Sequence, residues 1–499
     1  MCVSRPLALW IAAVAIFLAL RISLGQLGET LCTGLLIIAT SIRFGYGRKA
    51  NDAAPAAPAP APAPALASDP GSMNDASDER GNELLLPDTV PDVDEPAHFP
   101  TNAVIAATRT PVTRFAFLDN VKVFLTALVV THHVNCAFGV CGDSWYLVVG
   151  RGGPETFTRF LGIFTVLDQS FFMPLFFFIS AYFVPSSYTR KGWYKFREGR
   201  KMRILIPATF SLLVISPACI ALGGYVAGVE KLTYIPSTGV AWFLYWLLLF
   251  NWMYVTMPVK IEAEAGISTP MERQKFPGTI SRLLCGIGVC GLLLLPFLVL
   301  KPGSLAAMPI STGSVTCDFL MFYLGIQAKK NGWLELSLSD QMDIHPILLL
   351  FMVVAEGTGV ALLLQIVAEN ELAGLGLVCL AGIFCLDMSL LVLVTFQNYF
   401  NNETSMTKFL ARASYGVYLL HPIVVTGMTA LYINICNQLE LANIDPVAIG
   451  SAGEETPPVG TNSDYHYPVG WVLVNLASHI VIWPFAYGAT RLPVLKNIL

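Results

Sequence analysis

The chain has 499 residues, of which 55% are hydrophobic and only 13% are charged, and its mean hydropathy is +0.61. A soluble protein carries about a quarter charged residues, so this composition predicts a multi-pass protein of the lipid bilayer. The net charge of −4, without a basic tract interleaved with aromatic residues, argues against a nucleic-acid partner.

The first 50 residues contain two short apolar runs, at residues 6–20 and 31–42. Arg5 precedes the first run, as it would in a signal sequence, but no small-x-small cleavage site follows. We expect residues 1–50 to form a retained membrane hairpin or signal anchor, with one or two apolar segments. A cleaved signal sequence is the alternative.

Residues 51–113 have the composition of a linker. Alanine and proline alternate over residues 57–65, and such a sequence favours an extended polyproline-like spacer. An acidic stretch poor in aromatic residues follows over residues 69–95, and it cannot bury enough apolar surface to fold. We expect this segment to be a disordered tether.

The remaining region, residues 114–499, contains ten apolar stretches of membrane length. We therefore expect an all-α fold, a polytopic transmembrane helix bundle of about ten spans. The ten stretches lie near residues 115–138, 161–184, 204–228, 238–258, 280–300, 305–328, 345–367, 373–396, 413–435 and 469–490.

Basic residues are concentrated in alternate loops of this bundle. Seven of them lie between Arg190 and Arg203, after the second span, whereas the opposite loops include the acidic segment Glu440 to Asp464. Lysine and arginine favour the cytoplasmic side, so both ends of the bundle are expected in the cytoplasm. The glycosylation sequon at Asn402 would then also be cytoplasmic and unused.

Lys122 and His133 are the polar residues that stand out in the first span. They are eleven residues apart, which on a helix places them on nearly the same face, with about 16 Å of rise between them. Such groups are costly in a bilayer unless they line a polar cavity or find a partner. Asp119, one turn before Lys122, can pair with it. For His133, a hydrogen bond to another helix and a catalytic role both remain open on these grounds.

The order of residues in this span closely resembles the first helix of the acyltransferase-3 family. In that family Leu-Asp is followed by arginine or lysine, then ten residues, then histidine, as in Leu118-Asp119, Lys122 and His133. The family usually has arginine at the position of Lys122.

Further strings extend the resemblance over about three quarters of the chain. The second span contains Met-Pro-Leu-Phe-Phe and then Ser180-Ala181-Tyr182-Phe183, where the family has glycine in place of Ala181. Arg200 and Arg203 match an Arg-x-x-Arg element before the third span. A later string, Ser414-Tyr415 through His421, is similar to the family's penultimate span, and Trp242-Phe243-Leu244 is similar to the start of a middle span.

The resemblance implies an O-acyltransferase that uses acyl-CoA, most simply acetyl-CoA, as donor and needs no metal. The acceptor would be a hydroxyl group of a carbohydrate or lipid. His133 would be the general base and Lys122 would orient the donor. Arg200 and Arg203 would bind the donor phosphates, because guanidinium groups three residues apart can face one phosphate-rich ligand.

Two other classes of function compete with this interpretation. A secondary transporter of a small polar solute also uses buried polar residues in broken helices, although the sequence contains no internal repeat. A catalytically inactive membrane scaffold is the third possibility, and the presence of all four candidate residues disfavours it.

Several polar residues are weaker candidates for the site. His132 points about 100° away from His133 on the same helix and is expected to pack or assist, while Ser180 and His421 can line the cavity. Asp168, near one end of the second span, is expected to be solvated at the membrane interface. Residues of the later spans that we expect to face the bundle interior are Asp318, Asp387, Asn475 and His479.

Cys136 and Cys141 lie close together at one end of the first span, and the eleven cysteines contain no Cys-x-x-Cys metal or redox pattern. We expect two free thiols here, with a disulfide as the alternative.

Overall fold

The computed structural model describes residues 115–492, apart from gaps at 142–143, 151–152, 257–273, 288–303, 306–307, 310–313, 368–370 and 450–465. All described residues belong to one compact unit. The expected N-terminal hairpin over residues 1–50 and the expected tether over 51–113 lie outside the described residues.

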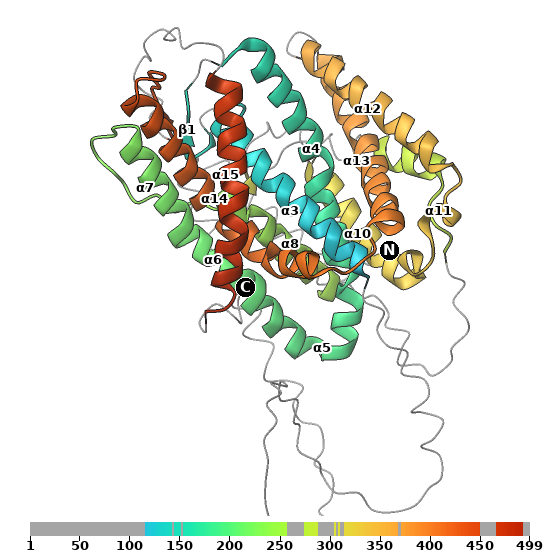
Figure 1. The fold of residues 1–499 in the computed structure, drawn as a ribbon. Helices are drawn as coiled ribbons and strands as arrows, with labels where there is room; N and C mark the ends of the chain where they lie inside the picture. The colour runs from blue at the N-terminus through green and yellow to red at the C-terminus, as the bar shows by residue number, and fades with distance from the viewer. Residues whose placement is uncertain are drawn as a thin grey trace, which may run out of the picture. The chain divides into compact units, whose positions relative to one another are not determined.

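The described region is a bundle of α-helices, as the composition predicted (Figure 1). The longer helices are α3 (Ala116–Ala137), α4 (Glu155–Tyr182), α5 (Val184–Arg200), α7 (Ser216–Val226), α8 (Trp242–Thr256), α10 (Ser314–Asn331), α12 (Pro346–Ile366), α13 (Glu371–Tyr399), α14 (Ser405–Gln438) and α15 (His466–Ala489). The shorter ones are α6 (Ile206–Phe210) and α11 (Leu338–Gln341). Four two-residue strands form two antiparallel pairs in the described region. Strand β1 (Leu147–Val148) pairs with β4 (Val447–Ala448), and β2 (Ser304–Leu305) pairs with β3 (Met308–Pro309).

Seven helical stretches within the described residues are long and apolar enough to cross a membrane, and the protein is therefore a multi-pass membrane protein. They cover residues 155–182, 184–226, 239–256, 346–366, 373–399, 405–438 and 466–489. Helices α3 and α10 form where two further spans were expected, but they are not among the seven. The span expected near 280–300 lies mostly outside the described residues, although residues 279–287 are helical.

The chain between α4 and α7 is irregular in a way that shapes one end of the bundle. Helix α5 bends at Gly192, whose φ of 67° is accessible to glycine at little cost. Two π-helical turns, Lys201–Leu205 and Ser211–Ile215, then flank α6. The segment with Arg200 and Arg203 is therefore irregular as well as basic. Such π-helical turns occur frequently at functional sites.

Helices α4 and α10 pack closely where the sequence departs from the family pattern at Ala181. A Cβ added at Gly325 of α10 would lie 2.9 Å from the Cβ of Ala181 and would overlap the carbonyl group of Phe178. The absence of a side chain at Gly325 thus makes room for the methyl group of Ala181.

Basic residues from distant parts of the sequence meet at one end of the bundle. The Lys122 ammonium lies 5.0 Å from the ring centroid of Phe183, and the Lys329 ammonium lies 5.2 Å from that of Tyr182. Helix α5 and the C-terminal end of α15 lie at one end in Figure 1, and β1 lies at the other. This clustering is what the alternate distribution of lysine and arginine in the loops predicted.

Candidate active site

Helix α3 brings His133 next to α14, where it meets His421. The Nδ1 atom of His133 lies 2.8 Å from the carbonyl oxygen of Val129, one turn earlier, and 3.1 Å from Nε2 of His421. His421 is fully buried, whereas His133 keeps partial exposure. The structure therefore joins two histidines that the sequence offered as separate candidates.

The hydrogen bonds of this pair define which ring nitrogens carry protons. A carbonyl oxygen only accepts, so the Nδ1 of His421, 2.8 Å from the Tyr418 carbonyl, carries a proton and donates it. Its Nε2 is then free to accept from His133. The single Nδ1–H of neutral His133 is shared between the carbonyl of Val129 and Nε2 of His421, so Nε2 of His133 is unprotonated. Within the described region this Nε2 makes no hydrogen bond, and it is the atom available to accept a proton.

Trp145 covers the ring of His133 from the loop after α3. Their ring centroids are 4.6 Å apart, with 33° between the ring planes. The indole is buried, with 5% of its surface exposed. Trp145 was not among the residues selected from the sequence, because it lies outside the apolar span and outside the family-like strings.

His132 lies beside His133 on α3, with 5.1 Å between the ring centroids, and it pairs with Asp168 of α4. Its Nδ1 lies 2.9 Å from Oδ1 of Asp168, and the carboxylate is 3% exposed. The expectation that Asp168 is solvated at the membrane interface is therefore wrong. The available signal was its position within the apolar span expected over residues 161–184, because a carboxylate inside such a span requires a partner in the bundle.

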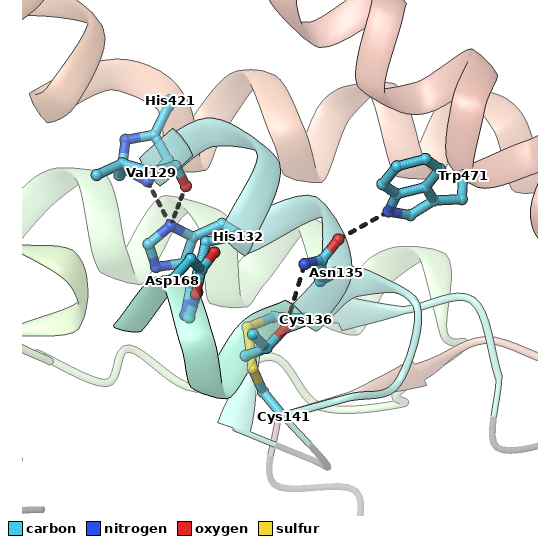
Figure 2. The surroundings of a disulfide bond; sticks show 10 residues. Val129, His132, Asn135, Cys136, Cys141, Asp168, His421 and Trp471 are labelled. Atoms are coloured by element: carbon cyan, nitrogen blue, oxygen red, sulfur yellow. Dashed lines mark hydrogen bonds and ion pairs between the residues drawn. A yellow bond between two sulfur atoms is a disulfide. The ribbon is translucent and has the colours of Figure 1, made fainter. Parts of the chain in front are cut away.

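The other faces of α3 also carry polar contacts. The Thr131 hydroxyl lies 3.1 Å from Oδ1 of Asn475 and 3.1 Å from Nε2 of His479, both on α15. Asn135 accepts from the indole N–H of Trp471 at 2.8 Å (Figure 2). The expectation that Asn475 faces the bundle interior is confirmed, and His479 lies beside it against α3.

Lys122 and Asp119 form the expected pair at the other end of α3, with 2.9 Å between Nζ and Oδ1. Both side chains keep part of their surface exposed. Lys122 thus lies at the basic end of the bundle, about 16 Å of helix rise from His133.

Arg200 and Arg203 lie at the same end. The Arg200 guanidinium is 4.7 Å from the ring centroid of Phe196, and the backbone carbonyl of Arg203 accepts a hydrogen bond from the Tyr415 hydroxyl. This bond ties the Arg-x-x-Arg element to the helix that carries His421. Ser180 makes no hydrogen bond with either histidine among the described residues, so the structure does not bring this candidate into the pair.

Cys136 and Cys141 form a disulfide in the structure, so the expectation of free thiols is wrong (Figure 2). Helix α3 ends at Ala137, and the turn that follows returns Cys141 to the last turn of the helix. The ligand atoms of His132, Cys136 and Cys141 lie within 4.8 Å of one another, but the two sulfur atoms are bonded to each other and are not thiolates.

Two carboxylates of the later spans are buried, as expected. Asp318 is 1% exposed, and Asp387 is completely buried. Asp387 accepts from Nε of Arg282 at 2.6 Å, a pairing that spans 105 residues of sequence. Neither carboxylate contacts the histidine pair in the described region.

Comparison with known proteins gives one match. A family model described as an acyltransferase domain, from the acyltransferase-3 group, matches residues 115–487, about three quarters of the chain. No curated protein and no solved structure matches the chain. The matched range begins one residue before α3 and contains His133, His421, Arg200 and Arg203.

Proposed function

The chain belongs to the acyltransferase-3 family, and from this premise we propose that it moves an acyl group, most simply acetyl, from a coenzyme A thioester to a hydroxyl group. The protein is a multi-pass membrane enzyme that transfers acyl groups. The acceptor would be a carbohydrate or lipid, presented at or across the membrane.

The observation that carries this proposal is the contact between His133 and His421. A hydroxyl group that attacks a thioester must lose its proton, and a neutral imidazole accepts protons efficiently near pH 7. The bonds to Val129 and His421 hold His133 with Nε2 unprotonated. His133 is therefore the general base of the proposed reaction, and His421 positions it.

The donor would enter from the basic end of the bundle, which we place in the cytoplasm. Arg200 precedes a π-helical turn there and Arg203 lies within it, and each guanidinium can bind phosphate in a bidentate manner. Lys122 lies at the same end of α3 and would orient the donor. The thioester arm would then extend along α3 toward His133.

The test is acceptor-dependent release of coenzyme A by the purified protein. We expect acetyl-CoA to be consumed when a suitable glycan or lipid from a panel is added, with an ester product visible by mass spectrometry. His133→Ala should lower turnover by roughly 10²–10⁴-fold, the usual contribution of a general base. Acetyl-CoA affinity should change little in this variant, because His133 is remote from the phosphate-binding end.

His132→Ala is the matched control, compared at equal amounts of folded protein. His132 is the neighbouring residue on α3, but it is engaged with Asp168, so its loss should affect turnover less. Full acyl transfer by the His133→Ala variant would overturn the role of His133. Solute uptake without consumption of the thioester would instead support a transporter and overturn the proposed reaction.

A further inference from the structure

The described residues of the loop between α3 and α4 make several independent contacts. The disulfide between Cys136 and Cys141 closes its first turn, and the N–H of Val149 donates to the carbonyl of Ala137 at 2.9 Å. Strand β1 then pairs with β4. The backbone on both sides of Trp145 is therefore fixed to other elements.

Tyr146 anchors the same loop inside the bundle. Its hydroxyl lies 2.6 Å from the hydroxyl of Ser216, at the start of α7. Burial raises the pKa of Tyr146, so this hydroxyl remains protonated. A Cβ added at Gly223 of α7 would overlap the carbonyl group of Tyr146. The loop thus approaches α7 so closely that only glycine fits, which leaves Trp145 little freedom to move.

The indole N–H of Trp145 has no hydrogen-bond partner among the described residues, although the nitrogen is buried. Leaving a buried donor unsatisfied is energetically costly, because the group has lost its bond to water and gained none in return. Such groups are rare in native proteins, and a catalytic role is one recognised explanation for them. Here the unpaired donor belongs to the ring that lies against His133.

The position of this donor distinguishes it from other unpaired groups. The indole N–H of Trp246 in α8 is also buried without a partner, but Trp246 makes no ring contact with either histidine in the part of the chain that the structure describes. Among the described residues, Trp145 combines an unpaired indole N–H with a ring contact to His133, whose Nε2 is unprotonated. Acyl transfer needs both a base and a donor for the oxygen on which negative charge develops.

We propose that Trp145 is a further catalytic residue, whose indole N–H donates a hydrogen bond to the carbonyl oxygen of the thioester. This inference rests on the proposed function, in which His133 is the base.

The reaction would proceed in two steps. In the first, the oxygen of the acceptor hydroxyl bonds to the thioester carbon while the hydroxyl proton passes to Nε2 of His133. The π electrons of the carbonyl group move to the carbonyl oxygen, which accepts the hydrogen bond from Trp145. The C–S bond then breaks, and the thiolate sulfur takes the proton back from His133. The products are an ester and coenzyme A with a free thiol.

The first test is spectroscopic and needs no acceptor. A hydrogen bond to a thioester carbonyl lowers its stretching frequency, so acetyl-CoA labelled with ¹³C at the carbonyl should show a lower frequency when bound to the unmodified protein than when free. Trp145→Phe keeps an aromatic ring against His133 but lacks the N–H, and its bound acetyl-CoA should absorb at a higher frequency than in the unmodified protein. An unshifted carbonyl band in the unmodified protein would overturn the proposal, whether or not any variant folds.

The second test is kinetic. Trp145→Phe should lower kcat by about 10²–10³-fold, the usual effect of removing one donor to a developing oxyanion, with a smaller change in KM. Trp246→Phe is the matched control, because it removes an equally buried and unpaired indole N–H away from the pair, and it should leave kcat and the carbonyl band unchanged. Unchanged kcat in Trp145→Phe would overturn the role of Trp145.

The two proposals fail in different ways. If His133→Ala retains turnover, the assignment of the base is wrong, whatever the carbonyl band shows. If His133→Ala loses turnover while Trp145→Phe keeps both turnover and the shifted band, only the inference about Trp145 fails.

Discussion

Nε2 of His421 lies 3.1 Å from Nδ1 of His133, although 288 residues separate them in the chain. The backbone carbonyl of Tyr418 holds the proton of His421 on Nδ1, so the nitrogen that faces His133 can only accept. His421 is thus suited to orient His133 and unsuited to donate a proton to it.

This relationship predicts a graded series of variants at position 421. His421→Ala removes one hydrogen bond of about 1 kcal/mol from His133, which corresponds to a loss of about fivefold in kcat. His421→Gln offers a carbonyl oxygen that can accept the same bond and should recover part of the loss. Steady-state kinetics with acetyl-CoA would measure both, and KM should stay unchanged. Identical kcat values for the two variants would contradict positioning through this bond.

The buried pair of His132 and Asp168 predicts a loss of stability rather than of chemistry. Asp168→Ala leaves Nδ1 of His132 buried without its partner, which should lower the free energy of unfolding by about 1–3 kcal/mol. Asp168→Asn keeps an acceptor oxygen and should cost less. Thermal unfolding of the purified protein, followed by tryptophan fluorescence, would measure the difference. Asp340 is exposed, so Asp340→Ala should leave the melting temperature nearly unchanged, and an equal effect at both positions would contradict this account.

The sequence predicted the helices of this protein better than their contacts. Apolar runs of membrane length suffice to place α4, α12, α13, α14 and α15, because the hydrogen bonds of a helix are all local. The charge of alternate loops predicted which ends of the helices lie together. The pair of Lys122 and Asp119 was also predictable, because both residues lie within one turn of one helix.

Contacts between helices depend on packing that no local pattern encodes. His133 and His421 were each identified from the sequence motif around them, but the contact between the two residues depends on how α3 and α14 pack. Asp168 was misinterpreted because its partner lies on another helix. Trp145 was missed for the same reason, since a tryptophan in a short loop has no significance until the loop is seen to return to α3.

The donor site predicts that coenzyme A binding and catalysis can be separated. Arg200→Ala and Arg203→Ala should each weaken binding of acetyl-CoA through lost pairing with phosphate, and the loss should be larger at low salt, where screening is weakest. Arg190 is exposed on the same segment, and Arg190→Ala should have a smaller effect. Calorimetric titration at two salt concentrations would measure all three variants. Equal losses at all three positions would point to general attraction by the basic segment instead of specific binding by Arg200 and Arg203.

The disulfide predicts a specific pattern of thiol labelling. When the protein is unfolded in detergent without reductant, N-ethylmaleimide should modify the free cysteines Cys219 and Cys436 but neither Cys136 nor Cys141. Prior reduction should make all four reactive, and mass spectrometry of the peptides would distinguish the two states. Labelling of Cys141 without reductant would show that the bond is not formed in the isolated protein.

The orientation of the bundle predicts that α5 and the end of α14 lie on opposite sides of the membrane. Lys195 and Glu440 are both exposed, so cysteine at either position should be reachable by a reagent from one side. In sealed vesicles whose cytoplasmic face is inward, a membrane-impermeant maleimide should label the Glu440→Cys variant at once and the Lys195→Cys variant only after permeabilisation. The reason is that the segment from Arg190 to Arg203 carries the largest group of basic residues, which are retained on the cytoplasmic side.

Labelling of the unsubstituted protein would measure the background from native thiols. Equal labelling of both variants before permeabilisation would place these two segments on one side, and the proposed cytoplasmic entry of the donor would then be wrong.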